Sequence, residues 1–278
     1  NMISLPANVS SQYISALLLI APRLDNGIEV ELLGEISSLP YIKMTLSLLE
    51  QIGVETQFKE NKIHVGPLRS IKNTPNSITV ESDWSSASYF YSFIALSEIG
   101  TQIQLSSYKQ NSLQGDSALV EIYRSFGVET KFDQDAITLI KVAPSVKEMN
   151  LDLRNTPDLA QTIAVSCLGL GICCHLSGLH TLKIKETDRL QALKNEMEKF
   201  GAEVTITEDT LTLNKALLDK SDKSSVTINT YNDHRMAMAF APLVLKTSFR
   251  ISKADVVSKS YPEFWKDLTG IGLDISEF

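Results

Sequence analysis

The chain has 278 residues, of which 43% are hydrophobic and 21% are charged. This apolar content is typical of a folded globular protein and excludes a disordered or low-complexity chain. The net charge of -7 argues against a general nucleic-acid or membrane-surface binder, because such surfaces carry a basic excess. We therefore expect neither nucleic acid nor a membrane among its partners, whereas a local cationic pocket is compatible with this composition.

The cysteines and histidines do not suggest a disulfide framework or a metal site. Cys167, Cys173 and Cys174 are odd in number and lie clustered in apolar stretches. With four His and no paired CxxC spacing, we expect no bound metal and a reducing, cytoplasmic setting. The most apolar early stretch, Tyr13–Pro22, is too short to span a membrane.

The first part of the chain contains two predicted helices. One is an apolar run that follows Asn8, and the other opens at Ser37–Tyr41 and ends near Gly53. Gly66–Asn76 is rich in turn-forming residues, so we place a domain boundary near residue 81.

The rest of the chain alternates between strands and helices, several of them preceded by an Asp that can cap a helix. The predicted elements are Ser77–Val80, Trp84–Ile99, Gln102–Leu105, Asn150–Leu153, Leu159–Gly171, a helix with an apolar stripe of Leu190, Leu193, Met197 and Phe200, a hairpin of Glu203–Thr207 and Thr210–Leu213, His234–Lys246 and Phe249–Ile251. A polar connector, Lys215–Ser224, precedes the last helix.

An internal repeat organises these elements. Three similar segments (LLEQIGVETQF, IYRSFGVETKF and EMEKFGAEVTI) have glycines 74 residues apart, at Gly53, Gly127 and Gly201. An Asp also precedes a run rich in small apolar residues at intervals of 75 residues, at Asp83, Asp158 and Asp233. Each unit is predicted to be βαβαββ, which indicates an α/β fold built from repeated layers.

Basic residues lie where helices are expected to begin. Lys185 and Arg189 lie at the start of KETDRLQALKNEM, Arg235 lies in the first turn of the helix at 234–246, and Lys259 precedes a Ser-Tyr-Pro turn. A cation is unfavourable at the positive end of a helix dipole unless an anion binds there. The pattern predicts a shared site for a polyanion, and the alternative for any one of these residues is a solvated surface position.

Hydroxyl and carboxyl groups lie at neighbouring junctions. Ser10, Ser11 and Ser38 lie at helix starts, where a hydroxyl either binds phosphate or caps the helix. Asp158 and Glu186 lie beside the cationic helix starts, and they serve either as a cap and a first-turn acid or as general base and acid. The serines that follow Asp83 are interpreted as capping residues.

Together these motifs resemble the EPSP synthase (3-phosphoshikimate 1-carboxyvinyltransferase) family. The residues that carry the resemblance are Val9-Ser-Ser-Gln12, Ser38-Leu-Pro-Tyr-Ile42, Asp83-Trp-Ser-Ser-Ala-Ser-Tyr-Phe90, Pro157-Asp158, Lys185-Glu-Thr-Asp-Arg-Leu190, Thr230-Tyr-Asn-Asp-His-Arg-Met-Ala-Met238 and Lys259-Ser-Tyr-Pro262. The resemblance implies two domains of three βαβαββ units, with phosphoenolpyruvate and shikimate 3-phosphate bound in the cleft between them. It implies transfer of the carboxyvinyl group to the 5-hydroxyl through a tetrahedral intermediate with release of phosphate, in the shikimate pathway of aromatic amino-acid and chorismate biosynthesis. It implies no metal and no organic cofactor, and we expect a monomer.

Motif positions in the resemblance also imply roles for single residues. Those implied for shikimate 3-phosphate are Ser10, Ser11, Gln12, Ser38, Tyr41, Asp158 and Lys185. Those implied for phosphoenolpyruvate are Gln12, Arg189, Arg235 and Lys259. The implied catalytic residues are Asp158 as base for the 5-hydroxyl, Glu186 as proton donor to the methylene carbon, and Lys259 beside the phosphate or bridging oxygen. His234 is interpreted as a residue that positions its neighbours.

Two departures from the family pattern stand out. Thr181 replaces an Asn that many members carry, which puts one shikimate contact in doubt. The N-terminal Lys-Ser…Arg segment and the Gly-rich stretch followed by Arg, which contact both substrates in the family, are not found in this sequence. The chain therefore resembles the C-terminal two-thirds of the family, with residues 1–81 as the last unit of an incomplete first domain and 82–278 as a second domain of three units.

Because of the missing segments, we expect this chain alone to be inactive or nearly so. From the role implied for Arg189, we expect Arg189→Ala in the complete protein to weaken phosphoenolpyruvate use far more than folding. Two alternatives remain. One alternative is a truncated, non-catalytic homologue that binds anions or serves as an interaction module. The other is the related UDP-N-acetylglucosamine enolpyruvyl transferase, against which the KETDRL and SSQ motifs argue.

Overall fold

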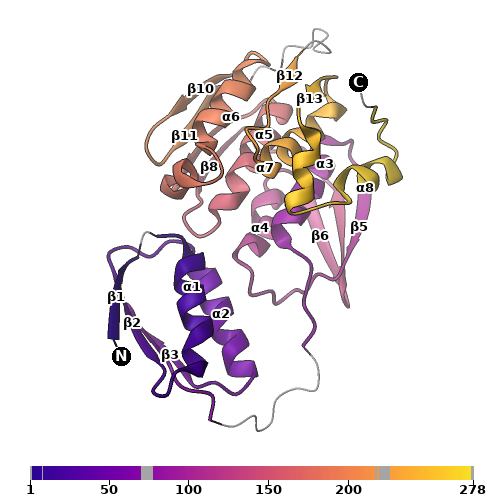
Figure 1. Ribbon diagram of the computed structural model, residues 1–278. Coiled ribbons are helices and arrows are strands. Elements are labelled where there is room, and N and C mark those ends of the chain that lie inside the picture. The colour runs from indigo at the N-terminus through magenta and orange to yellow at the C-terminus, as the bar shows by residue number, and fades with distance from the viewer. Residues whose placement is uncertain (1, 8, 70–77, 217, 219–225, 277–278) are drawn as a thin grey trace. The chain divides into compact units, whose positions relative to one another are not determined.

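The computed structural model describes residues 2–7, 9–69, 78–216, 218 and 226–276 (Figure 1). The chain separates into two compact bodies, which we call the first and second lobes and describe individually. The first lobe contains residues 1–81, 110–117 and 154–156, and the second lobe contains 82–109, 118–153 and 157–278. The two short segments 110–117 and 154–156 group with the first lobe, although the sequence places them in the second domain. Asn8 and most of the connector Lys215–Ser224 lie outside the described residues.

The first lobe is a four-stranded sheet with two helices on one face (Figure 1). Its elements are β1 (Met2–Pro6), α1 (Ser11–Ile20), β2 (Ile28–Leu33), α2 (Leu39–Gln51), β3 (Thr56–Lys59) and β4 (Lys62–Val65), with a 3₁₀ turn at Ala21–Arg23. The strand order is β1-β2-β4-β3, in which β1 and β2 are parallel and the other pairs are antiparallel. Apolar residues of both helices and of the strands form its core, for example Ile14, Leu18, Ile42, Val30 and Ile63.

The second lobe contains the remaining elements and a larger core. The first repeat in it consists of α3 (Trp84–Leu96), β5 (Gln102–Ser106), α4 (Leu119–Arg124), β6 (Val128–Asp133) and β7 (Ala136–Lys141). The second consists of β8 (Glu148–Asp152), α5 (Ala160–Leu170), β9 (Cys173–Ser177), α6 (Arg189–Glu198), β10 (Glu203–Ile206) and β11 (Leu211–Lys215). The third consists of β12 (Thr227–Ile228), α7 (His234–Phe240), β13 (Arg250–Ile251) and α8 (Phe264–Gly270). Short 3₁₀ turns of this lobe lie at Pro157–Leu159, His180–Ile184, Ala241–Leu245 and Ala254–Lys259, whereas the turn Gly115–Ala118 lies mostly in the segment that groups with the first lobe.

The predicted repeat is confirmed by the sheets. A strand, a helix and a parallel strand recur as β1–α1–β2, β8–α5–β9 and β12–α7–β13. Antiparallel hairpins follow the second helix as β3–β4, β6–β7 and β10–β11. Gly127 shows why its repeat position needs glycine, because its φ is +76° and an added Cβ would lie 1.9 Å from the carbonyl oxygen of Ala143.

Two predicted elements differ from the structure. Ser77 lies outside the described residues, and Ile78–Val80 does not adopt strand structure. The helix predicted at His234–Lys246 ends at Phe240 and continues as a 3₁₀ turn, since Pro242 has no backbone N–H to donate.

The helices α3, α5 and α7 pack together in the middle of the second lobe (Figure 1). Hydroxyl groups at equivalent repeat positions of α3 and α5 meet within this core, with Ser88 Oγ 3.0 Å from Thr162 Oγ1 and Ser166 Oγ 2.8 Å from Ser92 Oγ. This packing places the start of α7 close to the Pro157–Leu159 turn, where the charged residues gather.

Candidate functional site: a cluster of cations and carboxylates

Arg189 lies at the centre of the charged cluster in the second lobe. Its side chain is only 2% exposed and donates hydrogen bonds to three carboxylates. Nε lies 2.7 Å from Asp233 Oδ2, Nη1 lies 2.8 Å from Asp158 Oδ1, and Nη2 lies 2.7 Å from Glu186 Oε2. These bonds use three of the five N–H donors of the guanidinium.

Asp158 contacts three cations. Besides Arg189, Arg235 Nη2 lies 3.0 Å from Oδ2, and Lys185 Nζ lies 3.5 Å from Oδ1. Burial alone would raise the pKa of Asp158, but the positive charges of Arg235, Lys185 and Arg189 outweigh it and hold the pKa well below its usual value. Asp158 is therefore ionised at neutral pH.

Local sequence explains how these side chains reach one place. Asp188 caps α6 by accepting a hydrogen bond from Gln191 N at 3.0 Å, which makes Arg189 the first residue of the helix. Asp233 caps α7 in the same way, with Oδ1 2.9 Å from Arg235 N, while its other oxygen accepts from Arg189. The buried carboxylate of Asp233 thus contacts the side chain of Arg189 and the backbone N–H of Arg235.

Asp158 differs from the two other aspartates of the repeat. Asp83 and Asp233 cap their helices, whereas α5 has no side-chain cap and Asp158 lies in the preceding 3₁₀ turn. Its carboxylate therefore does not cap α5 and pairs instead with the three cations.

Glu186 and His234 border the cluster. Burial would raise the pKa of Glu186, but the adjacent Arg189 guanidinium lowers it below its usual value. Burial and the Arg235 guanidinium lower the pKa of His234. His234 Nδ1 is buried and makes no hydrogen bond within the described part of the chain.

The two lysines do not begin helices, contrary to the sequence prediction. Lys185 follows the 3₁₀ turn His180–Ile184 and precedes α6, and Lys259 is the last residue of the turn Ala254–Lys259. A cation at the end of a helical turn is favourable, so Lys259 breaks no dipole rule. Its Nζ lies 2.7 Å from the carbonyl oxygen of Asn232, which connects it to the residues before α7.

The hydroxyl residues predicted to bind phosphate lie in the first lobe. Ser10 caps α1, with Oγ 3.4 Å from Gln12 N, and Ser11 and Gln12 form the first turn of that helix. Ser38 precedes α2 in a left-handed conformation with φ of +54°, and its side chain makes no capping bond. Tyr41 N donates to Ser38 O at 3.1 Å. These five residues therefore lie at two helix starts of one lobe.

Two contacts and one buried hydroxyl within these sites were not predicted from the sequence. Asp233 was interpreted only as a repeat marker and cap, although its equivalence to Asp158 was a usable signal. Ser85 was interpreted as a capping residue, yet its Oγ lies 3.4 Å from Arg235 Nη2. Ser37 Oγ is buried beside Ser38 and makes no hydrogen bond within the described residues. Thr181, at the doubtful position, is also buried, and its Oγ1 likewise has no partner there.

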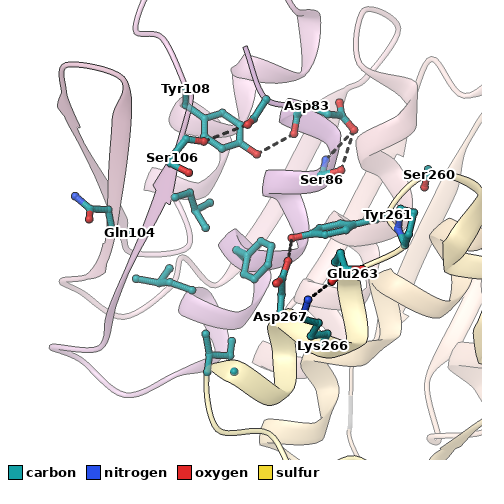
Figure 2. A pocket seen from close by; sticks show the side chains of 17 residues that line it. Asp83, Ser86, Gln104, Ser106, Tyr108, Ser260, Tyr261, Glu263, Lys266 and Asp267 are labelled. Carbon is teal, nitrogen blue, oxygen red and sulfur yellow. Dashed lines mark hydrogen bonds and ion pairs between the residues drawn. The ribbon is translucent and has the colours of Figure 1, made fainter. Parts of the chain in front are cut away.

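A groove of about 820 Å³ lies elsewhere in the second lobe, between the start of α3, β5 and α8 (Figure 2). On one side Ser86 Oγ donates a hydrogen bond to Asp83, and on the other Tyr261 Oη donates one to Asp267 at 2.6 Å. The residues that line the groove include none of those in the charged cluster.

Two observations concern the described residues alone. None of their helices has the length and apolar character needed to cross a membrane. No group of three or more His, Cys, Asp and Glu side chains in these parts of the chain is arranged to hold a metal ion.

Solved structures identify the class of fold. An EPSP synthase from Acinetobacter baumannii matches with a TM-score of 0.76 and 22% identity, over 100% of this chain and 64% of that one. The enolpyruvyl transferase NikO from Streptomyces tendae matches with a TM-score of 0.71 and 11% identity, over 99% of this chain and 65% of that one. The protein therefore has the α/β fold of the enolpyruvyl transferases.

Sequence comparison identifies the family within that class. The model of the EPSP synthase (3-phosphoshikimate 1-carboxyvinyltransferase) family matches residues 1–268. A 3-phosphoshikimate 1-carboxyvinyltransferase of Bacteroides fragilis is 43% identical over 99% of this chain and 67% of its own length, and one of Dehalococcoides mccartyi is 34% identical over 97% and 62%. The chain belongs to the EPSP synthase family, which confirms the predicted family and fold, and it spans about two-thirds of the length of these relatives.

Proposed function

We propose that this chain provides the phosphoenolpyruvate-binding and acid–base residues for carboxyvinyl transfer to the 5-hydroxyl of shikimate 3-phosphate. The observation that supports this most directly is the convergence of Arg189, Arg235 and Lys185 on Asp158 and Glu186. Such a group holds a multiply charged substrate and supplies both a base and an acid.

The arginines bind the substrate carboxylate in this proposal. Arg189 is nearly buried, and Glu186, which is 38% exposed, is the partner with room to move. A substrate carboxylate that replaces Glu186 on Arg189 removes the positive charge that keeps the pKa of Glu186 low. Glu186 then takes up a proton and can deliver it to the methylene carbon.

The remaining residues complete the reaction. Asp158 accepts the proton of the attacking 5-hydroxyl, whose oxygen bonds to the central carbon of phosphoenolpyruvate. Lys185 orients the shikimate hydroxyls, and Lys259 stabilises the phosphate as it leaves. Glu186, which has given up its proton, takes one back from the methyl group, and the electron pair of that C–H bond restores the double bond. We assign the 3-phosphate to Ser10, Ser11 and Ser38 in the first lobe, with Gln12 and Tyr41 beside the substrates.

We also propose that the 278 residues alone turn over slowly or not at all. The family's Lys-Ser…Arg and Gly-rich segments, which contribute further phosphate contacts, have no counterpart in this sequence. This chain leaves about one third of the length of its relatives uncovered, which is consistent with this proposal.

Two measurements on the purified chain test these proposals. Phosphorus NMR titration detects weak phosphoenolpyruvate binding, and we expect a Kd at or below about 10 mM. Phosphate release with both substrates, measured beside the Bacteroides fragilis enzyme, should be far slower than in that relative. Absence of binding would contradict the proposed function, whereas turnover equal to that of the relative would contradict only the proposed inactivity. Equal binding of phosphoenolpyruvate and inorganic phosphate would favour a non-catalytic anion-binding protein.

A further inference from the structure

The residues that lead into α7 adopt an uncommon conformation. Tyr231 and Asn232 have φ of +53° and +58°, so two consecutive residues other than glycine lie in the left-handed region. This conformation is unfavourable for residues with a Cβ, and a large aromatic residue tolerates it less well than Asn. It persists only where surrounding contacts hold it in place.

Glu196 on α6 provides those contacts. Its side chain is 0% exposed and accepts hydrogen bonds from Tyr231 Oη at 2.7 Å and from Asn229 N at 3.0 Å. Lys199 Nζ pairs with the same carboxylate and also donates to Thr227 O at 2.8 Å. A buried carboxylate is stable only when its oxygens are satisfied, so this group of bonds fastens residues 227–231 to α6.

The other end of the segment is fastened to the same helix. Asp233 accepts a hydrogen bond from Arg189, which lies seven residues before Glu196 and thus on the same face of α6. The left-handed turn therefore lies between two anchors on one helix face.

Each of the three cations proposed to bind phosphoenolpyruvate is bonded to this turn. Asp233 holds Arg189 through its side chain and caps the first turn of α7, which contains Arg235. The carbonyl oxygen of Asn232 accepts from Lys259 Nζ at 2.7 Å. A change in the turn therefore displaces all three cations at once.

We propose that Tyr231 is a positioning residue: its bond to Glu196 holds the turn that sets Arg189, Arg235 and Lys259 for an anionic substrate. This inference rests on the proposed function, since it specifies how the same site is held. Tyr231 does not need to touch the substrate for this role.

Tyr231→Phe removes the hydroxyl and keeps the ring. We expect phosphoenolpyruvate affinity of the 278-residue chain, measured by phosphorus NMR, to fall about two- to tenfold, the equivalent of one hydrogen bond. We also expect hydrogen exchange at the Nε–H of Arg189, followed by ¹⁵N NMR without substrate, to become faster by a similar factor.

Tyr91→Phe is the matched control. It also removes a tyrosine hydroxyl bond of 2.7 Å within the second lobe, to Thr130 Oγ1, but it touches none of the three cations. We expect a comparable loss of stability in urea with unchanged phosphoenolpyruvate affinity and unchanged Arg189 exchange.

The outcomes separate this inference from the proposed function. If the wild-type chain binds phosphoenolpyruvate and Tyr231→Phe binds it equally well, the positioning role is wrong and the proposed function stands. If the wild-type chain binds no phosphoenolpyruvate, the proposed function is wrong, and the positioning role falls with it. In either case, an unchanged exchange rate of the Arg189 Nε–H in Tyr231→Phe would show that the bond between Tyr231 and Glu196 does not hold the turn in place.

Discussion

Replacing Arg189 by alanine removes a cation that pairs with Asp158, Glu186 and Asp233. The three carboxylates are not affected equally. Asp158 keeps Arg235 and Lys185, and Glu186 is exposed enough to turn toward water. Asp233 is 0% exposed and would keep only its capping bond, so a single buried charge is left without its counter-ion.

The expected loss of stability follows from that single charge. Breaking a buried ion pair by removing one partner costs about 3–5 kcal/mol, which is a large part of the stability of an ordinary domain. From the sequence, this substitution is expected to affect substrate use far more than folding. Because Arg189 is buried, we now expect both substrate use and folding stability to decrease.

Urea unfolding followed by tryptophan fluorescence measures this loss. Trp84 and Trp265 both lie in the second lobe, so the signal reports on the lobe that contains Arg189. Lys194→Ala is the control on the same helix, since its pair with Glu198 is partly exposed and 3.8 Å long, and we expect a loss of about 0–1 kcal/mol.

A loss below about 1 kcal/mol for Arg189→Ala would refute the argument, because it would mean that the cluster does not depend on this cation.

Three further predictions use the same urea unfolding measurement. Burial and Arg235 lower the pKa of His234 below its usual value of about 6.5, so the unfolded chain binds the proton more readily and the unfolding free energy falls as the pH drops from 7 to 5. We expect His234→Gln to flatten this slope; parallel slopes would contradict the assignment. Lys259→Met, at an exposed position, should cost less than about 1 kcal/mol while weakening phosphoenolpyruvate binding in the NMR titration, and unchanged binding would count against its role. Gly127→Ala should cost more than about 2 kcal/mol because its Cβ meets a carbonyl oxygen, whereas Gly100→Ala, with a positive φ but open space, should cost about 1 kcal/mol; equal losses would show that backbone conformation alone matters.

Much of the fold could be predicted because its signals are local. The hairpin at β10–β11 and the helix α5 lie within one or two residues of their predicted bounds, since apolar spacing and turn residues are properties of neighbouring positions. Ile78–Val80 has the composition of a strand but no strand structure, because pairing depends on a distant segment.

The sequence by itself determined the repeat, the family and the candidate site residues, because each is recorded in a short motif. Only the tertiary structure decided which of them meet. Arg189 lies 31 residues from Asp158 and 44 from Asp233 along the chain, and their contact depends on how α5, α6 and α7 pack. The same packing revealed the hydrogen bond between Glu196 and Tyr231, because such a contact arises only when distant segments come together.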